Sequence, residues 1–201
     1  LPEGIIWEAT SRKGLEKLEI LKKNIKRIPI FEGAEKGNQN EIRALYYDRE
    51  RRMLLMANKK GTLMMTDGVN KRYFNTIDQT GDFGRVYGID KDKKGNYWIA
   101  TKGTGLIKMT PNGKGGYNYK RYRKGNNYSL NDDNTYCSIE DNEGNIWVAT
   151  YGGGVNVITK DRNGTEIVVN CNNMMKHYPA NEFKKVRTLA LDKKGRVWAG
   201  T

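Results

Sequence analysis

The chain has 201 residues, of which 36 are Lys or Arg and 23 are Asp or Glu, so its formal net charge is +13. This length allows one or two ordinary domains, and the charge favours polyanionic partners such as acidic glycans, nucleic acid or anionic lipid. No apolar run approaches the ~20 residues of a membrane-spanning helix, and residues 1–4 lack the features of a signal peptide. Because an initiator Met is also missing, we expect the sequence to be a piece of a longer protein.

A short motif recurs along the whole chain. Four copies place a Trp among apolar residues, with a small residue two positions later, and a fifth copy has Leu in place of Trp. The central residues are Trp7, Leu55, Trp98, Trp147 and Trp198. Their spacings of 48, 43, 49 and 51 residues match a four-stranded β-propeller blade and exceed a leucine-rich or ankyrin repeat. The repeat predicts an all-β chain, a β-propeller fragment over residues 1–201 with about four four-stranded blades.

In chain order, the chain enters the first repeat at its second strand, around Trp7. The second repeat, around Leu55, departs from the pattern, since Asn58 replaces Thr and residues 60–62 replace paired glycines. In the third repeat, alternation and turn residues predict strands at 85–90, 96–101, 106–110 and 117–123. The fourth repeat has the same order, with turns at 141–144, 151–154 and 161–164. Because the chain also ends in a second strand, we expect four repeats plus one strand, an incomplete propeller.

The best copies of the motif are residues 92–106 and 141–155. Each reads Asp, two variable residues, Gly-Asn, an apolar residue, Trp, an apolar residue, a small residue and Thr, and then a turn containing Gly. In this order they resemble the two-component regulator propeller repeat, and residues 128–134 resemble the lead-in of such blades. The resemblance implies the periplasmic sensor region of a hybrid two-component histidine kinase, an inner-membrane protein that responds to oligosaccharides derived from polysaccharides.

The same resemblance implies a non-enzymatic region without a cofactor, with the kinase outside it. It further implies a homodimer in the full-length sensor, membrane attachment only through other segments, and no nucleic-acid partner in this region. A carbohydrate-active propeller enzyme, either a lyase or a glycosidase, stays open, because 23 acidic residues could include two catalytic carboxylates. However, Asp92, Asp141 and Asp192 begin tight turns, where we expect them to cap the backbone. The single histidine, His177, is expected in a solvated loop.

The two cysteines are expected to stay unpaired and to bind no metal. Cys137 falls on a predicted inner strand, and Cys171 falls at the end of the outer strand of the same blade. Three strand spacings of ~4.8 Å separate such strands by roughly 14 Å. A disulfide requires Cα atoms within about 7 Å.

The predicted ligand site lies on the face where the longer loops emerge. Loops 124–134 and 172–185 connect successive blades there, and irregular loops on a rigid scaffold are common binding sites. Arg provides paired donors for carboxylate or sulfate, and Tyr provides a platform for a sugar ring. We therefore expect an oligosaccharide, with an acidic one favoured by the net charge, to bind residues at the inner-strand entrances and second turns: Arg43, Arg85, Tyr136, Arg187, Arg12, Lys59, Lys102 and Tyr151.

Overall fold

The computed structural model describes residues 5–10, 14–19, 24–32, 40–74 and 82–201. These residues form 17 β-strands, and none of them belongs to a helix that is long and apolar enough to cross a membrane. The chain divides into two compact units, Leu1–Val86 and Tyr87–Thr201. Each unit is described by itself.

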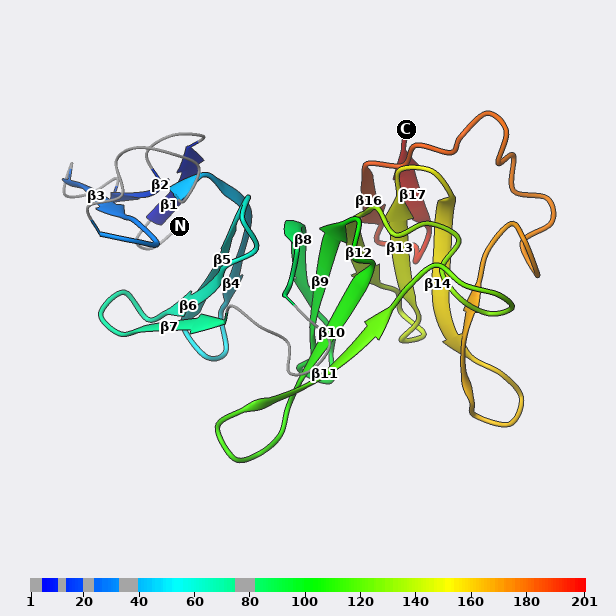
Figure 1. Cartoon of the computed structure of the whole chain (residues 1–201), viewed down its shortest axis with the longest axis horizontal. Coiled ribbons are helices and arrows are strands. Elements are labelled where there is room, and N and C mark those ends of the chain that lie inside the picture. Colours follow the sequence, from blue (N-terminus) through cyan, green and yellow to red (C-terminus); the bar gives the residue numbers. More distant parts are fainter. Residues whose placement is uncertain (1–4, 11–13, 20–23, 33–39, 75–81) are drawn as a thin grey trace. The chain divides into compact units, whose positions relative to one another are not determined.

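The first unit contains two antiparallel sheets, drawn in blue and cyan in Figure 1. The first sheet consists of β1 (Ile5–Thr10), β2 (Gly14–Glu19) and β3 (Asn24–Ile28). The second consists of β4 (Ile42–Asp48), β5 (Met53–Asn58), β6 (Leu63–Thr66) and β7 (Lys71–Phe74). Their facing side chains form one core, made of Leu15, Ile28, Ile30, Ile42, Leu54, Met56 and Met64. Burial of these apolar side chains is the main stabilising contribution in this unit.

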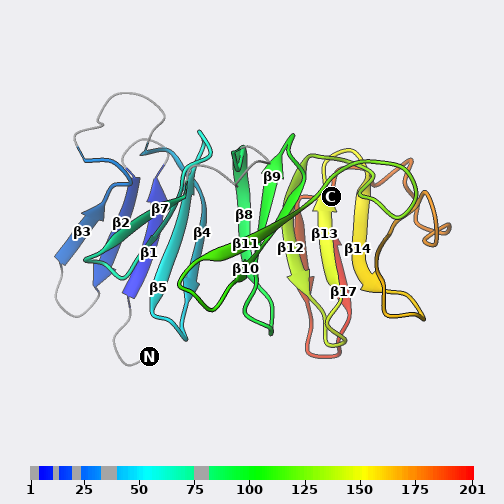
Figure 2. The same cartoon turned by 60° about the horizontal axis from the view of Figure 1, so that its bottom comes forward.

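The second unit contains two four-stranded sheets and a final pair of strands, which pack side by side (Figures 1 and 2). The first sheet consists of β8 (Arg85–Lys91), which begins at the unit boundary, β9 (Tyr97–Lys102), β10 (Leu106–Pro111) and β11 (Tyr117–Tyr122). The second consists of β12 (Thr135–Glu140), β13 (Ile146–Thr150), β14 (Gly154–Lys160) and β15 (Glu166–Val169). The last pair is β16 (Thr188–Leu191) and β17 (Val197–Gly200).

Apolar side chains fill both gaps between the sheets of the second unit. Between the first two sheets, Trp98 and Leu106 pack with Ile146 and Val148. Between the second sheet and the last pair, Ala149, Val155 and Val157 pack with Val186 and Leu189. Both faces of β13 are therefore buried, as its apolar residues on both faces predict.

The order of strands confirms the all-β propeller prediction. The described sheets have three, four, four, four and two strands in chain order, so the chain enters one blade at its second strand and ends in the second strand of another. This equals four blades plus one strand, as the repeat predicts. Three of the described sheets have four strands, the first has three and the last has two.

The register between second and third strands confirms the alignment of the repeat. In four blades the central residue pairs with the residue ten positions later: Trp7 with Lys17, Leu55 with Met65, Trp98 with Lys108, and Trp147 with Val157. Leu55 therefore occupies the Trp position of the blade that departs most from the motif. The period of the sequence had located this residue correctly.

An Asp at the start of the first turn holds together the hairpin of three blades. The Oδ1 atom of Asp141 accepts the backbone N–H groups of Glu143 and Asn145, both at 2.9 Å. Its Oδ2 atom accepts the indole N–H of Trp147 at 2.8 Å. Equivalent indole bonds run from Trp98 to Asp92 at 2.8 Å and from Trp198 to Asp192 at 3.0 Å. The expected capping role is confirmed, and the indole bond is an additional role of the same carboxylate.

The Asp–Trp contact also affects ionisation. Burial opposes the charge on Asp141, but the hydrogen bonds from Trp147 and Asn145 hold the pKa of this carboxyl below its ordinary value. The final residue of the turn, Gly144, has a φ of 85°, a conformation that favours glycine. The Asp, Gly and Trp of the motif thus act on one hairpin.

Replacing Asp141 with Ala is expected to destabilise the protein more than the same change at Asp161. Asp161 caps the later hairpin of the same sheet through the N–H groups of Asn163 and Thr165, but it accepts no indole bond. We expect a loss of about 2 kcal/mol for Asp141→Ala and about 1 kcal/mol for Asp161→Ala, given typical net values for such hydrogen bonds. Urea unfolding of the two variants measures the difference. Equal losses would show that the indole bond contributes nothing.

The cysteines lie where the sequence places them. Cys137 is in β12, and Cys171 follows β15, the outermost strand of the same sheet. Both thiols are free. Burial raises the pKa of Cys137 to about 11, so its thiol is protonated at neutral pH.

Stability is expected to fall as the pH rises from about 4 to about 6, because of Asp90 on β8. Burial raises the pKa of this carboxyl from 3.8 to about 6, with Glu140 and Asp92 adding to the shift and the N–H of Lys91 opposing it. The folded state therefore holds the proton that the unfolded chain has already lost in this pH range, which favours folding only at the acidic end. Asp90→Asn should raise the free energy of unfolding at pH 7 by about 1–2 kcal/mol, with little change at pH 4. Denaturant unfolding at both pH values provides the test, and an unchanged pH dependence in Asp90→Asn would contradict it.

Candidate functional site

Three of the predicted ligand residues meet in the second unit. Tyr136 is the second residue of β12, Tyr151 follows β13, and Arg187 precedes β16. The ring centroids of Tyr136 and Tyr151 are 5.7 Å apart. The guanidinium carbon of Arg187 lies 5.9 Å from the first ring and 5.8 Å from the second. Two residues of a type that packs against sugars and one of a type that binds anions thus share one surface.

Two further residues join this group. Tyr87 on β8 meets the edge of the Tyr136 ring at 5.1 Å, and the ammonium of Lys185 lies 5.2 Å from the centroid of Tyr151. Tyr87 precedes Tyr136 by 49 residues, the same interval that separates Trp98 from Trp147. This interval was the signal that could have identified Tyr87 from sequence. We call Tyr87, Tyr136, Tyr151, Lys185 and Arg187 the aromatic–basic cluster.

Hydrogen bonds donated by backbone N–H groups fix the strands that carry the cluster. The N–H of Thr101, at the end of β9, donates to Thr135 Oγ1 at 2.7 Å, next to Tyr136. The N–H of Tyr151 donates to a carbonyl at the start of β12 at 2.9 Å. The N–H of Arg187 donates to the carbonyl of Gly200 at 2.9 Å. The side chains therefore project from an anchored backbone, which reduces the entropy lost when a ligand binds.

The cluster presents positive charge beside half-buried rings. Arg187 and Lys185 are exposed, and neither makes an ion pair with any residue that the structure describes. Burial raises the pKa of Tyr136, although the charge of Arg187 opposes the shift. The ring of Tyr136 is therefore uncharged at neutral pH, and the two exposed cations beside it are available to an anion.

The remaining predicted site residues have different surroundings. In the first unit, Arg43 and Lys59 both form ion pairs with Glu41, the latter at 3.3 Å. Arg85 is exposed at the first residue of β8, and Lys102 is exposed at the last residue of β9. Arg12 lies outside the described residues. A ligand role for these five residues stays a prediction.

The three turn aspartates have structural roles, and the histidine lies in solvent. Asp92, Asp141 and Asp192 are engaged by backbone and indole N–H groups. His177 is exposed in the loop between β15 and β16. Within the part of the chain that the structure describes, no three His, Cys, Asp or Glu side chains are grouped as a metal site would require.

Comparison with known families identifies one of the repeats. Residues 129–152 match the family model of the two component regulator propeller. The chain carries a two-component regulator propeller repeat. The matched repeat includes β12 and β13 and contains both Tyr136 and Tyr151. The resemblance found in the sequence is confirmed at these residues.

Solved structures with the same fold include extracellular domains of two-component systems. The chain is similar to the extracellular domain of the hybrid two-component system BT4673 from B. thetaiotaomicron, at 24% identity and a TM-score of 0.72, with 98% of this chain and 27% of that one covered. It is also similar to the extracellular domain of the hybrid two-component system BT3049 from the same organism, at 16% identity and a TM-score of 0.62, with 98% and 31% covered.

A third similar structure is PorZ, a surface component of the type-IX secretion system of Porphyromonas gingivalis. Its identity is 15% and its TM-score 0.72, with 97% of this chain and 29% of PorZ covered. The chain therefore spans between a quarter and a third of these proteins. At these identities the similarity establishes the fold. A search of curated proteins gives no match.

Removal of the Arg187 side chain is expected to leave the fold intact. The residue is exposed, and its ring contacts are of a kind that contributes about 1 kcal/mol or less at such sites. Arg187→Ala should therefore lower the free energy of unfolding by no more than about 1 kcal/mol, as measured in urea. A loss of several kcal/mol would mean that the cluster is primarily part of the core.

Proposed function

We propose that the chain is part of a ligand-sensing propeller in a hybrid two-component regulator, and that it binds an oligosaccharide derived from a polysaccharide. The aromatic–basic cluster is the observation that carries the proposal, since it joins ring faces and exposed cations on an anchored backbone. The matched repeat supports the regulator assignment. The histidine kinase and its output would lie outside this region, which acts without catalysis.

The proposed location is outside the cytoplasm, in the periplasmic sensor region of an inner-membrane protein. Two of the similar structures are extracellular domains of hybrid two-component systems, which supports this location. In such a protein the propeller contributes recognition, and other segments contribute membrane attachment. A homodimer of the full-length sensor is part of the same proposal.

An acidic oligosaccharide suits the cluster better than a neutral one. Arg187 can donate two parallel hydrogen bonds to a carboxylate or sulfate, and Lys185 adds a second positive charge nearby. Tyr136 and Tyr151 are available to pack against a sugar ring. The net charge of +13 would also increase the association rate of an anionic ligand.

Calorimetric titration of the intact protein with uronic-acid, sulfated and neutral oligosaccharides tests the proposal. We expect the acidic ligands to bind best and Arg187→Ala to weaken their binding about tenfold or more, as for loss of a charge-assisted contact. The matched control is Lys114→Ala, which removes an exposed positive charge from the turn between β10 and β11. This control should change affinity little. Added salt should weaken binding, because exposed charges are screened over about 8 Å at physiological ionic strength.

Two results would contradict parts of this account. Preference for a neutral sugar, with no loss in Arg187→Ala, would remove the cluster as the recognition site. Cleavage of the oligosaccharide during the titration, detected by chromatography, would instead support a lyase or glycosidase. Because the two results are measured separately, they distinguish a wrong ligand from a wrong functional class.

A further inference from the structure

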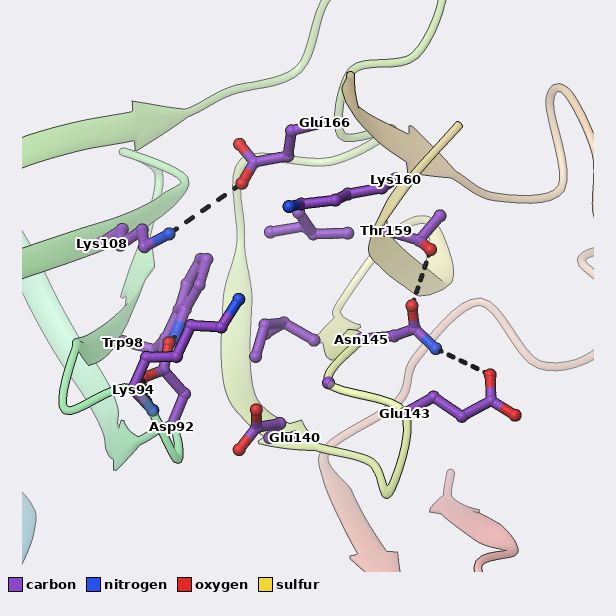
Figure 3. A pocket seen from close by; sticks show the side chains of 13 residues that line it. Asp92, Lys94, Trp98, Lys108, Glu140, Glu143, Asn145, Thr159, Lys160 and Glu166 are labelled. Atoms are coloured by element: carbon purple, nitrogen blue, oxygen red, sulfur yellow. Dashed lines mark hydrogen bonds and ion pairs between the residues drawn. The ribbon is translucent and has the colours of Figure 1, made fainter. Parts of the chain in front are cut away.

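A pocket of about 450 Å³ is shown in Figure 3. It lies where β12 ends and β13 begins, whereas Tyr136 and Tyr151 of the aromatic–basic cluster lie at the opposite ends of these strands. It is bounded by the sheet β8–β11 on one side and by the sheet β12–β15 on the other. The first sheet contributes Lys94, Trp98 and Lys108, and the second contributes Asn145, Lys160 and Glu166. The volume is within the range of roughly 300–1,000 Å³ that small-molecule sites occupy.

Three lysines give the pocket its chemical character. Figure 3 shows the ammonium groups of Lys94, Lys108 and Lys160 directed toward one space. Lys94 and Lys160 make no ion pair with any described residue. Lys108 reaches the carboxylate of Glu166 only at 4.0 Å. Lys94 and Lys160 can therefore donate charge-assisted hydrogen bonds to an anionic group.

The acidic side chains of the pocket are already engaged by protein donors. Glu166 accepts hydrogen bonds from Lys120 and from the hydroxyl of Tyr122, the latter at 2.6 Å. Burial opposes the charge on Glu166, but these hydrogen bonds hold its pKa below the ordinary value. Glu140 accepts the N–H of Lys93 at 2.7 Å. The available hydrogen-bonding capacity of the pocket is therefore weighted toward the lysine ammonium groups.

The other two carboxylates of the pocket also accept hydrogen bonds from protein donors. Asp92 caps its turn and binds the indole of Trp98. Glu143 accepts a hydrogen bond from Asn145, and in Figure 3 its carboxylate points away from the space between the lysines. Neither group competes directly for a ligand placed there.

The inner wall of the pocket is apolar and closed. Trp98 is only 3% exposed, and the ammonium of Lys108 lies 5.1 Å above its ring. Ile146 and Ile158 complete the wall and are buried. Because the indole face is covered, it provides no stacking platform for a sugar. Recognition in this pocket must rest on charge and hydrogen bonding.

We propose that this pocket binds a small anion of about monosaccharide size, through a carboxylate or phosphate group held by Lys94 and Lys160. The site is separate from the aromatic–basic cluster, and it would allow the propeller to bind a second, smaller anionic ligand. The hydroxyl of Thr159 donates a hydrogen bond of 2.6 Å to Asn145 Oδ1. These two residues and Lys108 border the same space and would contact the remainder of the ligand.

Calorimetric titration of the intact protein with glucuronate, glucose 6-phosphate and glucose tests this site. We expect saturable binding of at least one of the two anions and none of glucose. The double variant K94Q/K160Q removes both charges with little change of size, and it should weaken anion binding about tenfold or more. Both side chains are exposed, so the variant is expected to fold normally.

Lys194 provides a matched control. It occupies the same place in the turn Asp192–Gly195 that Lys94 occupies in Asp92–Gly95, and it does not line the pocket. K194Q should leave anion binding unchanged. The proposal is wrong if neither anion binds, if K94Q/K160Q binds as well as wild type, or if K194Q weakens binding equally. Arg187→Ala should not affect anion binding in this pocket. The failure of the pocket proposal can therefore be distinguished from the failure of the proposed function.

Discussion

The hydrogen bond from a Trp indole to the Asp at the start of the first turn organises the blades around Trp98, Trp147 and Trp198. It joins the turn to the second strand, so one carboxylate fixes both the hairpin and the orientation of the largest core side chain. In the two complete blades of the second unit, that side chain packs toward the next sheet. The same contact therefore links local turn geometry to packing between blades.

This arrangement leaves the two ends of the strands free to differ. At one end, connections between blades bring Tyr136, Tyr151 and Arg187 together. At the other end, the capped turns and the ends of β12 and β14 surround the lysine pocket. Apolar side chains pack between the sheets, and the strand ends carry the polar side chains of the cluster and the pocket.

The sequence predicted the repeated features well because they recur at a regular interval. Even Leu55, in the most divergent copy, was assigned correctly, since its distance from neighbouring copies limits where the strand can lie. The indole bond was missed, because residue types at fixed spacing do not reveal where a side chain points. The constant six-residue interval from Asp141 to Trp147, also found in two other copies, was the available signal.

The arrangement of the candidate site could be predicted only in part, because it depends on contacts between blades. Tyr136 and Arg187 are 51 residues apart in the chain, and the sequence could place them on one face without showing that they share a contact with Tyr151. The pocket was missed for the same reason, because Lys94 and Lys160, which line it, are 66 residues apart in the chain. The sequence also could not show that Glu41 pairs with two predicted ligand residues.

A crystal structure of the intact protein with a bound uronic-acid oligosaccharide would test the central claim most directly. We expect a sugar ring against Tyr136 or Tyr151, with a carboxylate within hydrogen-bond distance of the Arg187 guanidinium. Occupancy of another surface, with the aromatic–basic cluster left in solvent, would contradict the account.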